Sequence, residues 1–275
     1  MIDRSKSLLT AIVLGLSCAP ALAETPIERG SYLVNGIVGC GDCHTPRGKP
    51  PGPFLSGGNK QAGGQATTAN ITPDVETGIG GWTDQQIITA LREGKRPDGS
   101  TIGPPMPVRD YRSMSDDDVK AVVAYLRTVP PVKNAVAKSQ YKNPLPASYG
   151  PPVGHVPNPP ADDKIAQGAY LAGPLGHCME CHTPLGAEGR ADMESRLGAG
   201  GQDFRLQNGV VTSANLTPTG LSRYTDAQLK TIITTGKRPD GTEIVGPMEV
   251  SLYAKLTPND LDAIVAYLRS LPPKG

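Results

Sequence analysis

The sequence has few aromatic residues: nine tyrosines, two phenylalanines and one tryptophan in 275 residues. Aromatic rings supply much of the apolar area in the cores of small domains. Glycine and proline are abundant instead, with 33 and 28 residues, which indicates a chain rich in loops. We therefore expect a bound group to supply some of the apolar bulk that the side chains lack.

The chain also has almost no net charge, +1 at neutral pH. A protein without an excess of basic residues lacks the electrostatic footprint that nucleic acid requires. It also cannot steer a strongly charged partner from a distance. We therefore expect no nucleic-acid partner.

Long hydrophobic runs are missing after the first 23 residues. Arg4 and Lys6 precede the apolar run 8–16, and Ala21-Leu22-Ala23 follows it. This order of charged, apolar and small residues is typical of a secretory signal peptide, cleaved here after Ala23. Later segments fall short of the ~18 apolar residues of a membrane helix. The sequence thus predicts a signal peptide over 1–23, export to the periplasm and no integral membrane segment after cleavage.

Cysteine is scarce, and four of the five cysteines form two similar runs, GCGDCHTP (39–46) and HCMECHTP (177–184). The surrounding segments also recur in the same order: 28–46 resembles 166–184, 68–74 resembles 213–219, 81–100 resembles 223–242, and 116–131 resembles 258–273. Repetition of this kind indicates a duplicated domain. We predict domain 1 over 24–132, a Pro-rich linker over 133–160 and domain 2 over 161–275.

Three helices are expected in each domain. The first precedes each cysteine run, over 27–37 and 164–171. The middle helix begins at Thr83 or Thr225 and ends by Gly94 or Gly236, and the last follows Ser115 or Thr257 as the capping residue. No stretch alternates convincingly as a strand. The predicted fold class is therefore all-α, with two small, loop-rich helical domains in tandem.

The run Cys-x-x-Cys-His is typical of covalent haem c attachment. Two cysteines three residues apart on a helical turn reach one edge of a haem, and the adjacent histidine points to its iron. Three alternatives exist: a zinc shared by the two pairs, a disulfide and a thioredoxin-like redox pair. The pairs belong to separate repeats, which disfavours a shared metal, and the other two give the histidines no role. We predict two covalent haems c, attached to Cys40, Cys43, Cys178 and Cys181, with His44 and His182 as axial iron ligands.

The sixth iron ligand is predicted from the methionines. Only Met106 and Met248 occupy corresponding positions in the repeats, each in a loop of glycine and proline. Met114, Met179 and Met193 are interpreted as packing residues or as residues on the wrong side of the haem. His/Met ligation fills the iron and raises its potential, as in electron-transfer cytochromes. The predicted activity is electron transfer, without catalysis by the chain itself.

At this level the sequence resembles class I cytochrome c in tandem. The resemblance is carried by the two cysteine runs, the methionine loops, Gly30 and Gly168 in the first helices, and Tyr125 and Tyr267 in the last helices. It implies that the first and last helices of each domain cross closely at the glycine.

A narrower resemblance rests on the segment 69–82 and on 106–119. These segments are similar to cytochrome subunits of periplasmic alcohol, gluconate and aldehyde dehydrogenases. The resemblance implies a dehydrogenase as electron donor and a downstream carrier or terminal oxidase as acceptor.

Two other classes of function stay open in the sequence. One is a dihaem redox enzyme of the peroxidase or thiosulfate-oxidising type, which requires an open iron or a cysteine ligand. The other is a haem-free disulfide or metal-binding module. The repeated Asn70-Ile71-Thr72 and Asn215-Leu216-Thr217 have two interpretations of equal weight, plain turn chemistry or a loop beside the haem propionates.

Overall fold

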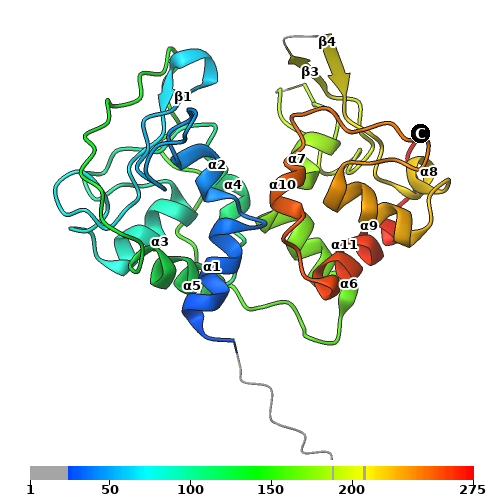
Figure 1. Ribbon diagram of the computed structural model, residues 1–275, viewed down its shortest axis with the longest axis horizontal. Coiled ribbons are helices and arrows are strands. Elements are labelled where there is room, and N and C mark those ends of the chain that lie inside the picture. Colours follow the sequence, from blue (N-terminus) through cyan, green and yellow to red (C-terminus); the bar gives the residue numbers. More distant parts are fainter. Residues whose placement is uncertain (1–23, 188, 207–208) are drawn as a thin grey trace, which may run out of the picture.

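The computed structural model describes residues 24–187, 189–206 and 209–275, and two groups of helices make up most of it (Figure 1). The predicted signal peptide and its cleavage site, residues 1–23, lie outside the described residues. In the N-terminal half, residues 24–132, the helices are α1 (Pro26–Asn35), α2 (Cys40–His44), η1 (Ala62–Gly64), α3 (Asp84–Glu93), α4 (Val108–Tyr111) and α5 (Asp116–Leu126). In the C-terminal half, residues 161–275, they are α6 (Lys164–Tyr170), the π-helical turn η2 (Leu171–Leu175), α7 (Cys178–His182), α8 (Pro218–Leu221), α9 (Asp226–Thr235), α10 (Val250–Tyr253) and α11 (Pro258–Ser270).

The middle and last helices begin and end where the sequence predicts. The side chain of Thr83 accepts a hydrogen bond from the backbone of Gln86, and Gly94 ends α3 in the left-handed conformation with φ +65°. A threonine cap satisfies a backbone donor of the first turn. Glycine ends the helix without the steric penalty that a Cβ has at this φ. Helix α9 repeats both features with Thr225 and Gly236.

The first and last helices of each half cross at a glycine, as the resemblance to class I cytochrome c implies. A Cβ built on Gly30 in α1 would lie 2.0 Å from the backbone oxygen of Ala121 in α5. A Cβ on Gly168 in α6 would lie 1.9 Å from the oxygen of Ala263 in α11. Only glycine allows the two backbones to approach this closely.

Strand content is small, so the helical class that the sequence predicts holds for the main part of the fold, to which two short ribbons are added. Strands β1 (Lys60–Gln61) and β2 (Ala66–Thr67) form one antiparallel ribbon, and β3 (Asp203–Leu206) and β4 (Gly209–Thr212) form another. β1 and β2 have two residues each and β3 and β4 have four, which is at or below the shortest length at which an alternating pattern is recognised. Each ribbon is a loop excursion between the cysteine run and the middle helix.

The connecting segment, residues 133–160, follows the surface of the N-terminal half before it reaches α6 (green in Figure 1). The backbone NH of Gln140 donates to the Gln65 oxygen at 2.7 Å, and that of Asp116 donates to the Val156 oxygen at 2.9 Å. The segment is therefore held along much of its length. We call residues 133–158 the strap.

The two halves meet along a seam with reciprocal contacts. The hydroxyl of Tyr32 in α1 donates to Asp260 in α11 at 2.5 Å, and that of Tyr170 in α6 donates to Asp118 in α5 at 2.8 Å. These pairs are equivalent positions in the repeat. The seam is therefore self-complementary, like the interface of a two-fold symmetric dimer.

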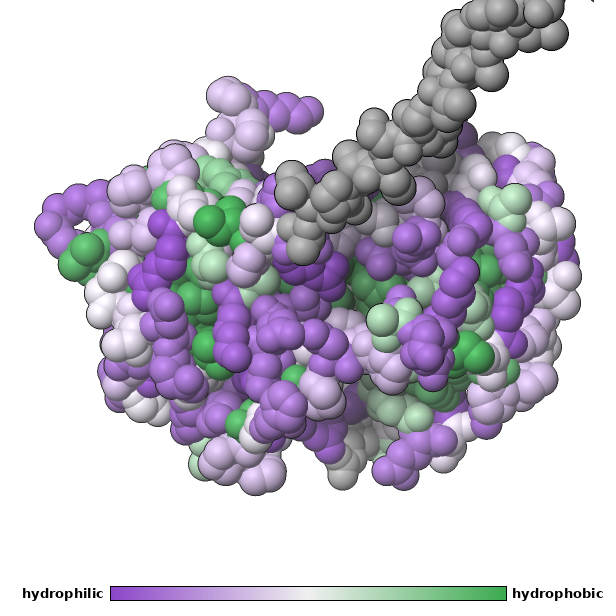
Figure 2. Space-filling model, turned by 90° about the horizontal axis from the view of Figure 1, so that it is seen from below, coloured by the Kyte–Doolittle hydropathy of each residue, from purple (hydrophilic) through white to green (hydrophobic). Residues whose placement is uncertain are grey.

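The face seen in Figure 2 is largely hydrophilic, with small hydrophobic patches between polar side chains. Within residues 24–187, 189–206 and 209–275, no helix has the length and hydrophobicity needed to cross a membrane.

Candidate functional site

Each cysteine run forms a single helical turn that begins at a residue in the left-handed conformation. Gly39 precedes α2 with φ +62°, and His177 precedes α7 with φ +50°. Cys40 and Cys43 lie one turn apart on α2, and so do Cys178 and Cys181 on α7. The two cysteines of a run therefore share one face of the turn, as predicted from their spacing.

Cys40, Cys43, Cys178 and Cys181 form no disulfide with one another. Burial raises the pKa of Cys40 to about 12, and it does the same for Cys178. Thiol–disulfide exchange requires a thiolate, so buried thiols with raised pKa values do not suit a thioredoxin-like redox pair. Among the described residues, no three histidine, cysteine or acidic side chains gather as a metal site, which disfavours the shared-zinc alternative.

Both histidines are held in the same way. Nδ1 of His44 lies 2.7 Å from the carbonyl oxygen of Ala69, and Nδ1 of His182 lies 2.7 Å from that of Ala214. A carbonyl only accepts hydrogen bonds, so Nδ1 carries the proton and Nε2 keeps its lone pair. Burial lowers the pKa of both rings, which favours the neutral form. A neutral histidine oriented through Nδ1 is what an iron ligand requires.

A glycine makes each of these contacts possible. Gly57 has φ +74°, and a Cβ on it would lie 2.4 Å from the carbonyl carbon of Ala69. Gly200 has φ +71°, and its Cβ would lie 2.5 Å from the same atom of Ala214. The backbone NH of Gly57 also donates to the His44 oxygen at 2.6 Å. The glycine therefore lets two loop segments pass close to the histidine from both sides.

An amide side chain closes each cysteine turn, and the sequence did not single it out. Nδ2 of Asn59 donates to the backbone oxygens of Cys43 at 2.7 Å and Thr45 at 2.6 Å. In the other half, Nε2 of Gln202 donates to the oxygens of Glu180 and, at 2.5 Å, of Thr183. The last carbonyls of a helix lack internal partners, and these amides supply them. The residues differ in type, so the repeat conceals their common role.

The two predicted methionine ligands occupy equivalent loops. Met106 is half-buried and packs against the hydrophobic core, and Met248 is half-buried too. Each follows a cis peptide bond to proline, at Pro105 and Pro247. Helix α4 begins two residues after Met106, and α10 begins two residues after Met248.

The other described methionines have separate positions. Met114 is 1 % exposed and Met179 is 4 % exposed, both within the core, and Met193 is 39 % exposed. Packing, the interpretation given to Met114 in the sequence, agrees with this burial.

A tyrosine in α4 or α10 lies beside each cysteine pair. Burial, followed by the nearby Cys40 and Cys43, raises the pKa of Tyr111. Burial, followed by Cys178 and Cys181, raises that of Tyr253. The helix that follows each methionine loop is thus adjacent to the cysteine turn of the same half.

The ring of Tyr111 also reaches across the seam. Its centroid lies 5.2 Å from that of His177, which precedes Cys178 in the other half. In the C-terminal half the hydroxyl of Tyr253 donates to the oxygen of Gly176 at 3.1 Å. These tyrosines therefore link each cysteine turn to the seam.

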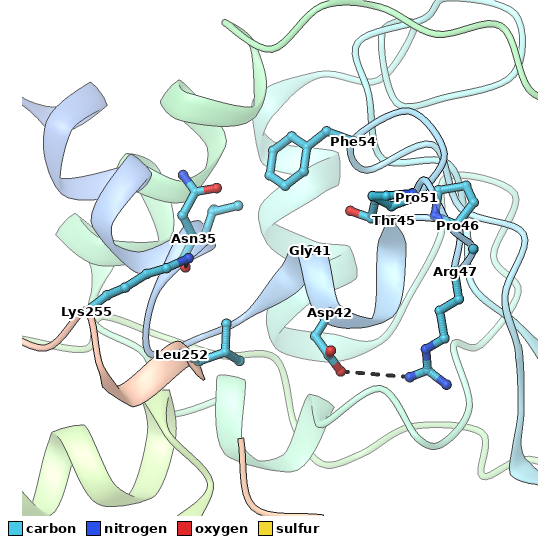
Figure 3. A pocket seen from close by; sticks show the side chains of 12 residues that line it. Asn35, Gly41, Asp42, Thr45, Pro46, Arg47, Pro51, Phe54, Leu252 and Lys255 are labelled. Carbon is cyan, nitrogen blue, oxygen red and sulfur yellow. Dashed lines mark hydrogen bonds and ion pairs between the residues drawn. The ribbon is translucent and has the colours of Figure 1, made fainter. Parts of the chain in front are cut away.

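A cleft of about 420 Å³ lies beside α2 (Figure 3). Gly41 and Asp42, the two residues between the cysteines, line it together with Phe54, Leu252 and Lys255. Cys40, Cys43 and His44 do not line this cleft, so it is distinct from the face that carries the predicted haem ligands.

The Asn-x-Thr runs have a structural role in this protein. Oδ1 of Asn70 accepts from Thr72, and its Nδ2 donates to the oxygen of Val132 at 2.7 Å. Asn215 makes the same bonds to Thr217 and to Lys274. Each run therefore ties the loop after the histidine-binding carbonyl to the chain that follows the last helix. This finding favours the turn interpretation.

Comparison with known proteins agrees with the geometry. The cytochrome c family model matches residues 27–130 and 165–272, one match for each half. The cytochrome c subunit of a quinone alcohol dehydrogenase from Gluconacetobacter polyoxogenes is 34 % identical, covering 99 % of this chain and 63 % of the relative. The gluconate 2-dehydrogenase cytochrome c subunit of Pantoea cypripedii is 34 % identical, covering 98 % and 66 %. A diheme cytochrome c-type protein of Cereibacter sphaeroides is 32 % identical, covering 98 % of both chains.

The chain therefore belongs to the cytochrome c family. With two matched regions and a diheme relative of the same extent, it is a tandem dihaem cytochrome c that carries two covalently bound haems c. The two dehydrogenase relatives are cytochrome c subunits. The chain spans less than two thirds of the length of the two dehydrogenase subunits.

Proposed function

We propose that this chain relays electrons from a dehydrogenase to a downstream carrier or terminal oxidase through two sites of one design. Haem iron supplies one-electron oxidation and reduction when bound. The residues proposed to hold the two groups are Cys40, Cys43, His44 and Met106 in the N-terminal half, and Cys178, Cys181, His182 and Met248 in the C-terminal half. The relatives named as dehydrogenase cytochrome subunits support the choice of donor.

The observation that carries this proposal is the orientation of the two histidines. Each donates from Nδ1 to a carbonyl oxygen at 2.7 Å and so keeps Nε2 available on the turn that bears two free cysteines. Two donor sets with the same geometry suit two haems of the same ligation. A filled methionine position at both irons suits electron transfer and leaves no open iron for peroxide.

The test replaces the proposed methionines one at a time. Met106→Ala and Met248→Ala should each lower the potential of one haem, because the thioether stabilises the reduced iron. Each variant should also gain carbon monoxide binding at one haem, whereas the wild type should bind it poorly. Met193→Ala, at an exposed methionine outside both sites, is the matched control and should change neither property.

Two results would contradict the assignment. If Met106→Ala or Met248→Ala leaves both potentials unchanged, another residue is the ligand. If the wild-type protein binds carbon monoxide rapidly, one iron is open and the redox-enzyme alternative becomes the better hypothesis. Haem content of the denatured protein in pyridine, expected at about two per chain from the two attachment motifs, confirms loading in every variant.

Export to the periplasm completes the proposal. It is supported by the charged, apolar and small-residue order of residues 1–23. N-terminal sequencing of the mature protein should begin at Glu24. An intact N-terminus on the haem-loaded protein would contradict cleavage after Ala23.

A further inference from the structure

The two methionine loops are anchored to the preceding helix in the same way. The backbone NH of Ile102 donates to the oxygen of Gly94 at 2.7 Å, and that of Ile244 donates to the oxygen of Gly236 at 2.7 Å. Each loop thus starts from the end of the middle helix and leads to its methionine. The loops differ in sequence, with Gly103-Pro104 in one and Val245-Gly246 in the other, and they also differ in what covers them.

The strap covers the Met106 loop. The hydroxyl of Tyr141 donates to the oxygen of Pro104 at 2.8 Å, and that of Tyr149 donates to the oxygen of Ile102 at 2.7 Å. The Tyr141 ring also lies against Gly103, where a Cβ would come within 2.6 Å of it. Two carbonyls of the loop that leads to Met106, those of Ile102 and Pro104, are therefore bound to tyrosines of the strap.

The strap also holds the helix that follows Met106. The guanidinium carbon of Arg109 lies 5.3 Å from the centroid of the Tyr149 ring, within the range of a cation–π interaction. Nη2 of Arg112 donates to the oxygen of Pro151 at 2.5 Å. The loop is thus fixed on both sides of its methionine.

The Met248 loop is different. Val245, at the position of Gly103, is 62 % exposed, and a Cβ on Gly246 would have no heavy atom within 4 Å. Ser251 and Ala254 stand where the N-terminal half has Arg109 and Arg112. The side chains that hold the strap in one half have thus no counterpart in the other.

We propose that Tyr141 and Tyr149 of the strap are positioning residues that hold Met106 on its iron more firmly than Met248 is held. This inference rests on the axial ligands proposed above. A methionine leaves its iron only if its loop moves away. In the N-terminal half that movement must break two hydrogen bonds to the strap, and the described residues of the C-terminal half show no equivalent bonds to the Met248 loop.

The experiment follows the weak sulfur-to-iron charge-transfer absorption of the oxidised full-length protein during a urea titration. The amplitude of this band counts the methionine–iron bonds. The wild type should lose it in two steps. Met248→Ala should keep only the later step, and Met106→Ala should keep only the earlier one.

A double variant then tests the tyrosines themselves. Tyr141→Phe with Tyr149→Phe keeps both rings and removes both hydroxyls. The later step should move to lower urea, with roughly a tenfold or larger increase in the equilibrium constant for loss of Met106, since one hydrogen bond is worth about fivefold. The earlier step should not move. Asn158→Ala removes a strap contact to Asp117, away from the methionine loop, and should move neither step.

The outcomes separate the inference from its premise. If either methionine variant keeps the band at full amplitude, the ligand assignment is wrong, and the inference that the strap holds Met106 is wrong with it. If the band halves in both variants but the two steps coincide, or Met106 leaves its iron first, the ligand assignment stands. The inference that the strap holds Met106 more firmly is then overturned. An unmoved later step in the double tyrosine variant also overturns it. Should that variant not fold, the order of loss in the methionine variants decides.

Discussion

In the N-terminal half His44 donates to Ala69 beside Gly57, and in the C-terminal half His182 donates to Ala214 beside Gly200. The halves also share the glycine crossing of the first and last helices and the asparagine–threonine tie. All these contacts lie within one half and support its cysteine turn. The contacts that both halves share are therefore those that position each site within its own half.

The halves differ where they face something other than their own site. Asp118 accepts two hydrogen bonds from Arg29, whereas the position equivalent to Arg29 is Gln167, which bonds to backbone oxygens of the connecting segment. On the seam, the position of the repeat that is Asp110 in the N-terminal half is Leu252 in the C-terminal half. The two halves are thus alike in the contacts around each site, and they differ in the residues that face the strap and the seam.

The largest expected effect comes from the shared glycine crossings. Gly30→Ala and Gly168→Ala place a methyl group about 2 Å from a helix backbone oxygen, which cannot yield as a side chain would. We expect each to cost about 3 kcal/mol or more of unfolding free energy, measured by urea unfolding of the haem-loaded protein. Gly154→Ala has open space around its Cβ and should be nearly neutral. A difference above about 1 kcal/mol between the two crossings would show that the halves are not equivalent.

Loss of the asparagine hydrogen bonds should lower the free energy of unfolding more in the N-terminal half than in the C-terminal half. Asn70 is 3 % exposed, and Asn70→Ala removes the acceptor of the Thr72 backbone NH and the nearer of the two donors to the Val132 oxygen. We expect a cost of about 2–3 kcal/mol, because buried groups would lose hydrogen bonds that water cannot replace. Asn215 is only half-buried, so Asn215→Ala should cost about 1 kcal/mol. Urea unfolding measures both, and the reverse order would contradict the role of burial.

Repetition made much of this protein predictable from its sequence. Thr83 and Gly94 were located because the rules of helix capping and termination act within a few residues. The crossing at Gly30 was expected only because the resemblance to class I cytochrome c implies it. The cysteine runs followed from spacing alone. The Met106 and Met248 assignments rest on loop equivalence and stay predictions.

Contacts between distant segments were not predictable. Asn59 and Gln202 share a role but not a residue type, so comparison of the repeats passes over them. Tyr32 and Tyr170 occupy equivalent positions of the repeat, but their partners lie across the seam and depend on how the halves pack. The two short ribbons give no periodic signal because each strand has too few residues.

The seam carries a pH-dependent difference between the halves. Burial, followed by the charge of Glu180, raises the pKa of Asp110 to about 7, and its Oδ2 has no hydrogen-bond partner in the described structure. The folded state therefore binds this proton more tightly than the unfolded state, in which the pKa is about 4. Stability falls as pH rises from about 4 to 7, and the loss is complete above the folded pKa.

Asp110→Asn removes the charge and should therefore stabilise the protein at pH 8 by about 1–2 kcal/mol, and have little effect near pH 4. Urea unfolding at both values is the measurement. Asp162→Asn, at an exposed position, is the control and should show no such dependence. An equal effect of Asp110→Asn at both pH values would mean that Asp110 does not titrate in this range.

The smallest expected effect tests the reciprocity of the seam. Tyr32→Phe removes the donor to Asp260, and Tyr170→Phe removes the donor to Asp118; each should cost about 1 kcal/mol. Burial, followed by the aspartate acceptor, raises the pKa of Tyr32. The protonated hydroxyl is the donor, so this contribution is complete below about pH 10 and is lost as pH rises through the higher folded pKa. Urea unfolding at pH 8 and at high pH measures this contribution. Tyr224→Phe is the control, because the Tyr224 ring contacts Arg223 of the same half.

The two single variants and the double variant together decide how the seam works. If the halves separate only when both hydrogen bonds are lost, the double variant should cost more than the sum of the singles. Its unfolding should then divide into two transitions, one for each half. Additive costs with a single transition would mean that the hydrophobic residues of the seam hold the halves together and that the tyrosines only fix their register.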